Sequence, residues 1–129
     1  MRAAVLKGAS GQPENREVFT EERCFLLELW NHDRDPDVSI ARARVAPGVT
    51  TALHRLSVDE RYLVASGEGR VEVEGIEPAL VSPGDVVLVP AGKTQRITNL
   101  GSDDLVFLCV CTPRFEPRHY ADCEGAMTP

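Results

Sequence analysis

The sequence predicts an all-β fold, a sandwich or barrel made of many short strands. Apolar or alternating segments recur at close spacing along most of the chain, and glycine and proline residues separate them. Residues 117–126 in the tail are the segment whose pattern suggests a short helical turn. The elements that support this prediction are given below in chain order.

The first expected strand covers residues 22–31, an apolar run that ends at a stretch rich in Asn, Asp and Pro. Residues 38–46 form the next expected strand, because Arg42 and Arg44 alternate there with small or apolar residues. A Pro-Gly pair then interrupts the pattern.

Short strands are expected at 54–56 and 60–66, followed by a turn at Gly67-Glu68-Gly69 that needs a permissive backbone. Residues 70–74 alternate charged residues with valine, which predicts one solvated and one packed face. Four further strands are expected at 78–81, 86–89, 95–100 and 105–111.

Two motifs with fixed spacing lie in the centre of the chain. They read Gly48-x5-His54-x-Leu56-x3-Glu60-x6-Gly67 and Gly84-x5-Pro90-x-Gly92-x2-Gln95-x3-Asn99. The pair resembles the two signature motifs of the cupins, G-x5-H-x-H-x3/4-E-x6-G and G-x5-P-x-G-x2-H-x3-N. The resemblance implies a double-stranded β-helix, or jelly-roll barrel. It further implies one cupin domain over 1–129, with a core barrel at about 22–112, an N-terminal arm and a C-terminal tail.

The resemblance also implies a metal site. Carried over from the family's ligands, the metal-binding residues are His54, Glu60 and Gln95, whereas Leu56 replaces the second histidine and cannot bind a metal. An imidazole, a carboxylate and an amide oxygen favour manganese, iron or zinc. The alternative is a polar cluster that replaced a lost metal, in which His54 and Gln95 donate hydrogen bonds to Glu60.

Three other side chains are candidates for the same pocket. Tyr62 shares the face of Glu60, so it is either a donor to a ligand, and a candidate catalytic residue, or a core aromatic with a satisfied hydroxyl. Cys109 and Cys111 share one strand face, where they cannot easily form a disulfide with each other. They are expected to be free buried thiols, with the alternative that they complete a metal site.

The arginines divide into two groups. Arg55, Arg61 and Arg96 each neighbour a pocket residue in sequence, so strand alternation points them away from the pocket. For Arg42 and Arg44 two readings stay open, a clamp for a carboxylate or phosphate inside the pocket and an outer face paired with Glu or Asp.

Three polar residues elsewhere are given structural readings. Asn99 is expected to be a structural residue at a strand end. His32 and His119 lie in charged, loop-like surroundings and are expected to be exposed.

The composition of the chain limits the classes of partner and the cellular locations to be expected. The 129 residues carry a net charge of −6 and a pI near 5, which argues against a nucleic-acid partner. No apolar run approaches the roughly 20 residues that span a membrane, and the first residues are too short in their apolar part for a signal peptide. The expected location is the cytoplasm, where the four cysteines stay reduced.

Two functions are consistent with these features. The first is a divalent-metal-dependent enzyme acting on a small organic molecule, either a Lewis-acid lyase, isomerase or hydrolase, or a dioxygenase. The second is a non-catalytic cupin that binds or senses a metabolite. A homodimer is expected in either case, because the strand at 22–31 is apolar on both faces and would leave apolar surface exposed in a monomer.

Overall fold

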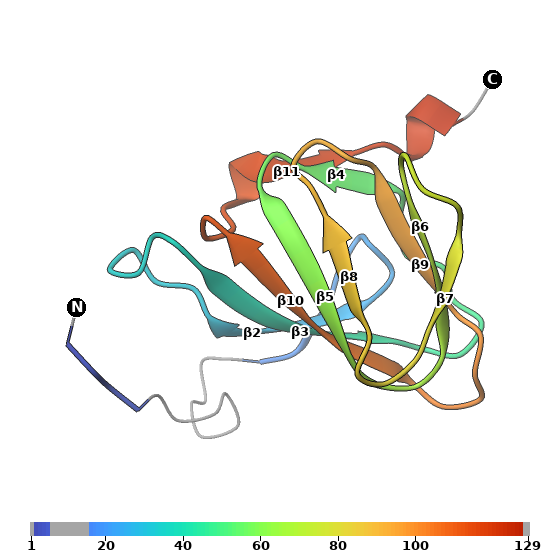
Figure 1. The fold of residues 1–129 in the computed structure, drawn as a ribbon, viewed down its shortest axis with the longest axis horizontal. Coiled ribbons are helices and arrows are strands. Elements are labelled where there is room, and N and C mark those ends of the chain that lie inside the picture. The colour runs from blue at the N-terminus through green and yellow to red at the C-terminus, as the bar shows by residue number, and fades with distance from the viewer. Residues whose placement is uncertain (1, 6–15, 128–129) are drawn as a thin grey trace.

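The computed structural model describes residues 2–5 and 16–127, which form two antiparallel sheets packed against each other (Figure 1). This is the all-β jelly-roll architecture that the sequence predicts. Among the described residues, no helix has the length and apolar character needed to cross a membrane.

The larger sheet has six strands in the order β1-β2-β3-β10-β5-β8. Their bounds are Val18–Phe19, Phe25–Trp30, Ser39–Val45, Leu105–Thr112, Asp59–Ser66 and Val86–Val89. The central strand β10 pairs with both β3 and β5, so segments far apart in sequence lie side by side there.

The smaller sheet has five strands in the order β11-β4-β9-β6-β7. Their bounds are Tyr120–Asp122, His54–Leu56, Gln95–Asn99, Gly69–Val73 and Ala79–Val81. Two 3-10 helices, Pro117–His119 and Glu124–Met127, flank β11.

The core lies between the sheets and follows from strand alternation. In β10, Leu105, Phe107 and Cys109 point inward and are buried, whereas the residues between them are half-buried on the outer face. Val71 and Ile97 of the smaller sheet belong to the same cluster. The side chains at alternate positions of β4 and β5 therefore also face this interior.

Most expected strands are present within a few residues of their predicted bounds, with two additions. The strand expected at 22–31 begins at Phe25, because Thr20 to Cys24 form a tight turn closed by backbone hydrogen bonds. Two short strands, β1 and β11, were not expected from the sequence. In the tail the expected helical turn is divided into two by β11.

Arg42 and Arg44 lie on the outer face of β3. Arg44 binds Glu17 through two nitrogens at 2.6 and 3.1 Å, binds Asp104 at 2.9 Å, and lies 4.0 Å over the Phe25 ring. Arg42 is 3.6 Å from Glu17. These pairings confirm the outer-face reading and exclude the anion clamp in the pocket.

Arg55, Arg61 and Arg96 also point away from the interior, as predicted. Arg55 is exposed, Arg61 donates to Thr112 Oγ1, and Arg96 pairs with Glu72 at 2.9 Å. These three side chains therefore take no part in the interior site.

Asn99 is structural, as expected: its amide donates to the carbonyl oxygens of Val45 and Asp103. The expectation that His119 is exposed is wrong. His119 is 8% exposed, because its Nδ1 accepts a hydrogen bond from the Glu116 amide and its ring packs edge-on against Phe115.

Candidate functional site

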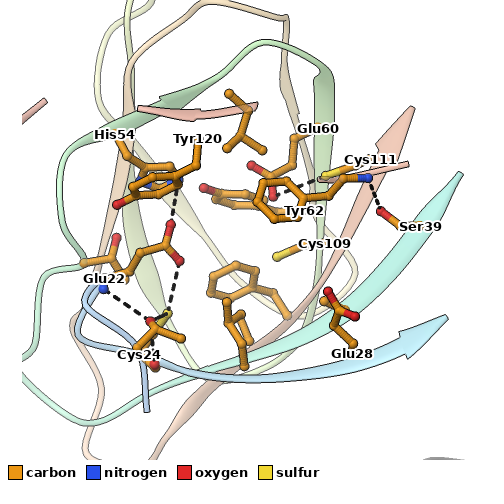
Figure 2. Close-up of a pocket in the computed structure, with 18 of the residues that line it drawn as sticks. Glu22, Cys24, Glu28, Ser39, His54, Glu60, Tyr62, Cys109, Cys111 and Tyr120 are labelled. Carbon is orange, nitrogen blue, oxygen red and sulfur yellow. Dashed lines mark hydrogen bonds and ion pairs between the residues drawn. The ribbon is translucent and has the colours of Figure 1, made fainter. Parts of the chain in front are cut away.

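A cavity of about 310 Å³ lies between the sheets at the end of the barrel where β4 and β11 are found (Figure 2). Its walls come from the inner faces of β2, β3, β5 and β10, from β4, and from the turn that precedes β2. His54, Glu60, Tyr62, Cys109 and Cys111 all line it, so most of the predicted site residues converge there.

Both ring nitrogens of His54 have a polar partner. Its Nδ1 is 2.8 Å from the carbonyl oxygen of Ala52, and its Nε2 is 3.2 Å from Oε1 of Glu22. Both partners are acceptors, an arrangement that an imidazolium ring satisfies. The ring also stacks on Tyr120, with centroids 5.3 Å apart. His54 is therefore held in one orientation, with Nε2 directed at a carboxylate.

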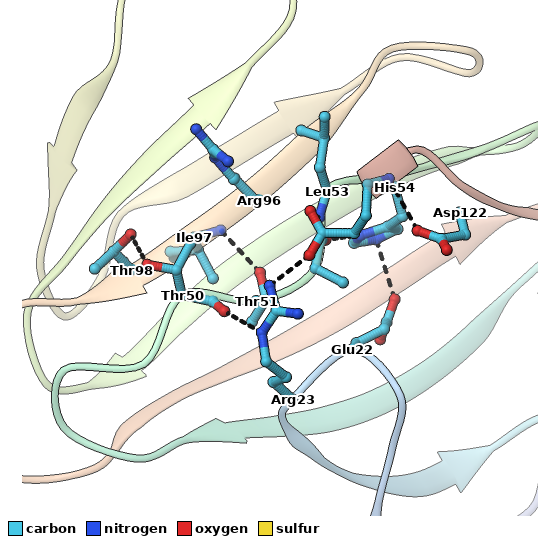
Figure 3. Close-up of polar contacts among 12 residues, drawn as sticks. Glu22, Arg23, Thr50, Thr51, Leu53, His54, Arg96, Ile97, Thr98 and Asp122 are labelled. Carbon is cyan, nitrogen blue, oxygen red and sulfur yellow. Dashed lines mark hydrogen bonds and ion pairs between the residues drawn. The ribbon is translucent and has the colours of Figure 1, made fainter. Parts of the chain in front are cut away.

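Glu22 is the residue of this site that sequence reasoning missed. It lies in the turn before β2, where Arg23 adopts a left-handed φ of 65°. Arg23 anchors the turn by donating to the Thr50 carbonyl oxygen at 3.0 Å and to Glu124 Oε1 at 2.7 Å (Figure 3). No local pattern in the sequence marks Glu22, because its partner His54 belongs to a distant strand.

Glu60 is 6% exposed and incompletely partnered. Its Oε2 lies 3.9 Å from the Cys111 thiol, which donates to it, whereas its Oε1 has no hydrogen-bond partner. Burial raises the pKa of Glu60 to about 7, against opposing effects from His54, Gln95 and the Cys109 thiol. A carboxyl group that titrates near neutrality can donate or accept a proton, or bind a cation.

Gln95 is fully buried and lies behind the cavity wall. The Tyr62 hydroxyl donates to its Oε1, and its Nε2 faces Glu60 closely enough to lower the pKa of that carboxyl without meeting hydrogen-bond geometry. Gln95 is not among the described residues that line the cavity. Tyr62 therefore has a satisfied hydroxyl, and its ring lies tilted against Phe107 with centroids 4.6 Å apart, as the core-aromatic reading expects.

The expected hydrogen-bonded cluster forms with different partners. The sequence-based alternative has His54 and Gln95 donating to Glu60, but His54 binds Glu22 and Gln95 accepts from Tyr62. The reason is the turn before β2, which brings in a second carboxylate that competes for the imidazole. Glu60 is left with one oxygen free.

Three thiols line the cavity and none is activated. Burial raises the pKa of Cys24 and of Cys111 to about 12, and raises that of Cys109 as well. All are free, as expected. Since the thiolate is both the nucleophile and the metal ligand, burial disfavours both roles for these cysteines.

Two of the three ligand atoms that the resemblance implies already have protein partners in this arrangement. The Gln95 oxygen that would coordinate is engaged by Tyr62, and Nε2 of His54 is engaged by Glu22. Within 2–5 and 16–127, no three His, Cys, Asp or Glu side chains gather closely enough to hold a metal ion. Leu56, in place of the second histidine, packs with Val58 and Cys111.

Comparisons with known proteins agree with this architecture. The family model described as a cupin domain matches residues 41–111. The endoribonuclease YbeY of Myxococcus xanthus is 37% identical over 79 residues, which cover 61% of this chain and 26% of that protein. The chain thus spans about a quarter of the length of that relative.

Two further proteins match over most of their own length. The oxalate-binding protein of Thermotoga maritima is 28% identical over 110 residues, 84% of this chain and 83% of that protein. The structure of KdgF from Halomonas sp. superposes with a TM-score of 0.69 at 22% identity, covering 81% of this chain and 93% of that one. The latter likeness concerns the fold alone.

Proposed function

Because the chain belongs to the cupin family, we propose that it binds a small organic molecule in the cavity around Glu60, in a site that needs no resident metal. The observation that carries this proposal is a cavity of about 310 Å³ whose lining includes Glu60, a buried carboxyl group with one oxygen that has no hydrogen-bond partner. Small-molecule sites are concave, mostly apolar and furnished with a few polar groups of this kind. The role is metabolite binding or sensing rather than catalysis.

The arrangement of the polar side chains supports a metal-free site. Tyr62 donates to Oε1 of Gln95, and His54 pairs with Glu22, so two of the three ligands that the resemblance implies already have protein partners here. The oxalate-binding relative supports a small-molecule ligand. It does not fix the ligand's identity, because this cavity has no arginine or lysine among its described lining residues to hold an anion.

A cavity-filling variant tests the proposal. Ala41 lines the cavity, so Ala41→Leu occupies space that a ligand needs. Ala65 is exposed on the outer face of β5, and Ala65→Leu is the matched control. In a saturation-transfer NMR screen of small metabolites, we expect binders to the parent that Ala41→Leu loses and Ala65→Leu retains. Absence of any such binder contradicts the proposal.

A second candidate function is a metal-dependent enzyme with His54, Glu60 and Gln95 as ligands to manganese, iron or zinc. Two observations favour it: metal-binding histidines commonly donate Nδ1 to a backbone carbonyl, as His54 does toward Ala52, and Glu60 Oε1 is free. Glu22 and Tyr62 would both have to release their partners first. The bound metal would supply Lewis-acid or oxygen-activating chemistry, for a lyase, isomerase, hydrolase or dioxygenase reaction, with Tyr62 as candidate catalytic residue.

Elemental analysis separates the two functions. Protein purified without a histidine tag is dialysed and then offered manganese, iron or zinc. The metal-free proposal expects no stoichiometric uptake by the parent and none by Gln95→Ala. Stoichiometric uptake that Gln95→Ala abolishes would establish the second candidate instead.

We also propose a homodimer. The surface that supports it differs from the expected one, since β2 is not an edge strand. The edge strand β8 exposes Val86 and Leu88, at 63% and 60%, beside Leu63 of β5. An open edge with apolar side chains is self-complementary across a two-fold axis, so a second copy is the partner that suits it.

The four free cysteines support the expected cytoplasmic location. Thiols stay reduced in the cytosol, whereas oxidising compartments favour disulfides.

A further inference from the structure

The cavity is lined by an excess of carboxyl groups. Glu21, Glu22, Glu28 and Glu60 all contribute to its wall, and among the described lining residues the single side chain that can carry positive charge is His54. His54 is already paired with Glu22. Even with an imidazolium ring, the described lining residues carry more potential negative than positive charge.

Glu60 is the deeply buried member of this group of carboxyl groups. Glu60 lines the cavity and is only 6% exposed. Its Oε1 has no hydrogen-bond partner. An ionised carboxylate only accepts hydrogen bonds and has about four lone-pair positions. The weak thiol donor of Cys111 uses one of them. The group that complements Glu60 must therefore bring an N–H or O–H donor.

The rest of the wall suits an apolar body. The rings of Tyr62 and Phe107 lie tilted against each other, and Phe115 and Tyr120 line the same cavity. Aromatic faces attract cations as well as apolar surface. Carboxylates combined with several aromatic rings form a site suited to an organic cation.

We propose that the cavity binds a small organic ammonium ion, with its N–H groups directed at Glu60 and its apolar part against Tyr62 and Phe107. This inference rests on the proposed small-molecule role of the same cavity and adds the charge class of the ligand. It departs from the anion that the name of the Thermotoga maritima relative indicates for that protein.

The test uses three probes of matched size that differ in charge: benzylammonium, benzyl alcohol and benzoate. Titrations at about pH 8 keep Glu60 ionised, since its pKa is about 7. We expect benzylammonium to bind about tenfold more tightly than benzoate, the ratio that a carboxylate and aromatic faces can supply. Amide resonances of Glu60 and Cys109 should shift on binding, which locates the probe.

Two variants and one control decide the outcome. Glu60→Gln should remove most of the preference for benzylammonium while leaving the affinity for benzyl alcohol within about twofold. Glu28→Gln, at the exposed side of the cavity, should reduce the preference by less. Glu77→Gln makes the same charge change on the surface and should have no effect.

Each unfavourable result of these titrations points to a different part of the proposal. If benzyl alcohol or benzoate binds in the cavity and benzylammonium is not preferred, the ammonium inference is overturned and the binding role stands. If the preference survives Glu60→Gln, the assignment to Glu60 is overturned. If none of the probes binds in the cavity, the ammonium inference is overturned, and the metabolite screen with Ala41→Leu decides the proposed function separately.

Discussion

The Tyr62 hydroxyl donates a hydrogen bond to Oε1 of Gln95, and the two residues belong to different sheets. The bond crosses the interior of the barrel, where both side chains are buried. It uses the oxygen that corresponds to a metal ligand in the cupin family. A polar position of the family's metal site thus serves here to join the two sheets.

Tyr62→Phe tests the contribution of this bond to stability. Removal of the hydroxyl leaves the Gln95 side chain buried with no hydrogen-bond partner at either end. We expect the free energy of unfolding in urea to fall by about 1–3 kcal/mol, the cost of an unpaired buried polar group. Tyr120→Phe is the control, because Tyr120 is half-buried, and it should cost less. Equal losses for both variants would show that the Tyr62–Gln95 bond adds little.

Glu60→Gln tests the pH dependence of stability. The folded pKa of Glu60, about 7, lies above the ordinary value of 4.5, so the folded protein retains this proton to higher pH than the unfolded chain. The contribution of Glu60 to stability is therefore fully present below about pH 4.5 and is lost as the pH rises to about 7. Relative to the parent, Glu60→Gln should gain on the order of 3 kcal/mol between these limits.

The difference in pH-dependent stability between the parent and Glu60→Gln reports on Glu60 alone. The groups that act on its pKa are His54, Gln95, Glu22 and Cys109, and all remain in the variant. Arginine partners lower the pKa of three other carboxyl groups, those of Glu17, Glu72 and Glu124. Protonation of these groups at acid pH destabilises both proteins equally. Urea unfolding at several pH values gives the two curves. Parallel curves would mean that the carboxyl of Glu60 is not perturbed.

Leu56→His tests why the metal site is incomplete. Leu56 is two residues from His54 on the same face of β4 and lines the cavity, so a histidine there would add an imidazole beside the first. We expect the variant to bind zinc at least about tenfold more tightly than the parent, measured by competition with a chromogenic chelator. Val58→His is the control, because Val58 packs in the same cluster as Leu56 but is not among the residues that line the cavity. Similar gains for both would point to adventitious binding.

Leu88→Asp tests the proposed dimer. The substitution places a charge on the exposed edge strand β8 and should leave the fold intact, because Leu88 points outward. Light scattering coupled to size exclusion should give twice the 14.1 kDa chain mass for the parent and the single chain mass for the variant. Leu80→Asp, on the edge strand β7 of the other sheet, is the control and should remain dimeric. A parent that elutes as a monomer at micromolar concentration contradicts the dimer.

Spacing in the sequence was enough to place His54 and Glu60 inside the barrel. Strand alternation requires only local information, and both residues lie on inward positions of short strands between turns. The same reasoning oriented Arg55, Arg61 and Arg96 outward.

The partners of these side chains were not predictable in the same way. Glu22 reaches His54 because a turn with a left-handed Arg23 aims it there, and β11 pairs with β4 through a return of the tail. Both contacts join segments that are far apart in the sequence, so no periodic pattern of residues predicts them. His119 illustrates the same limit, since a charged local sequence concealed a buried ring.

The Arg23–Glu124 ion pair connects residues 101 positions apart in the chain, beside the turn that brings Glu22 to the cavity. Both side chains are partly exposed, at 48% and 37%, so dissolved salt screens their attraction. The anchoring of the turn that carries Glu22 should therefore weaken as ionic strength rises, and Glu124→Gln should remove much of that salt dependence.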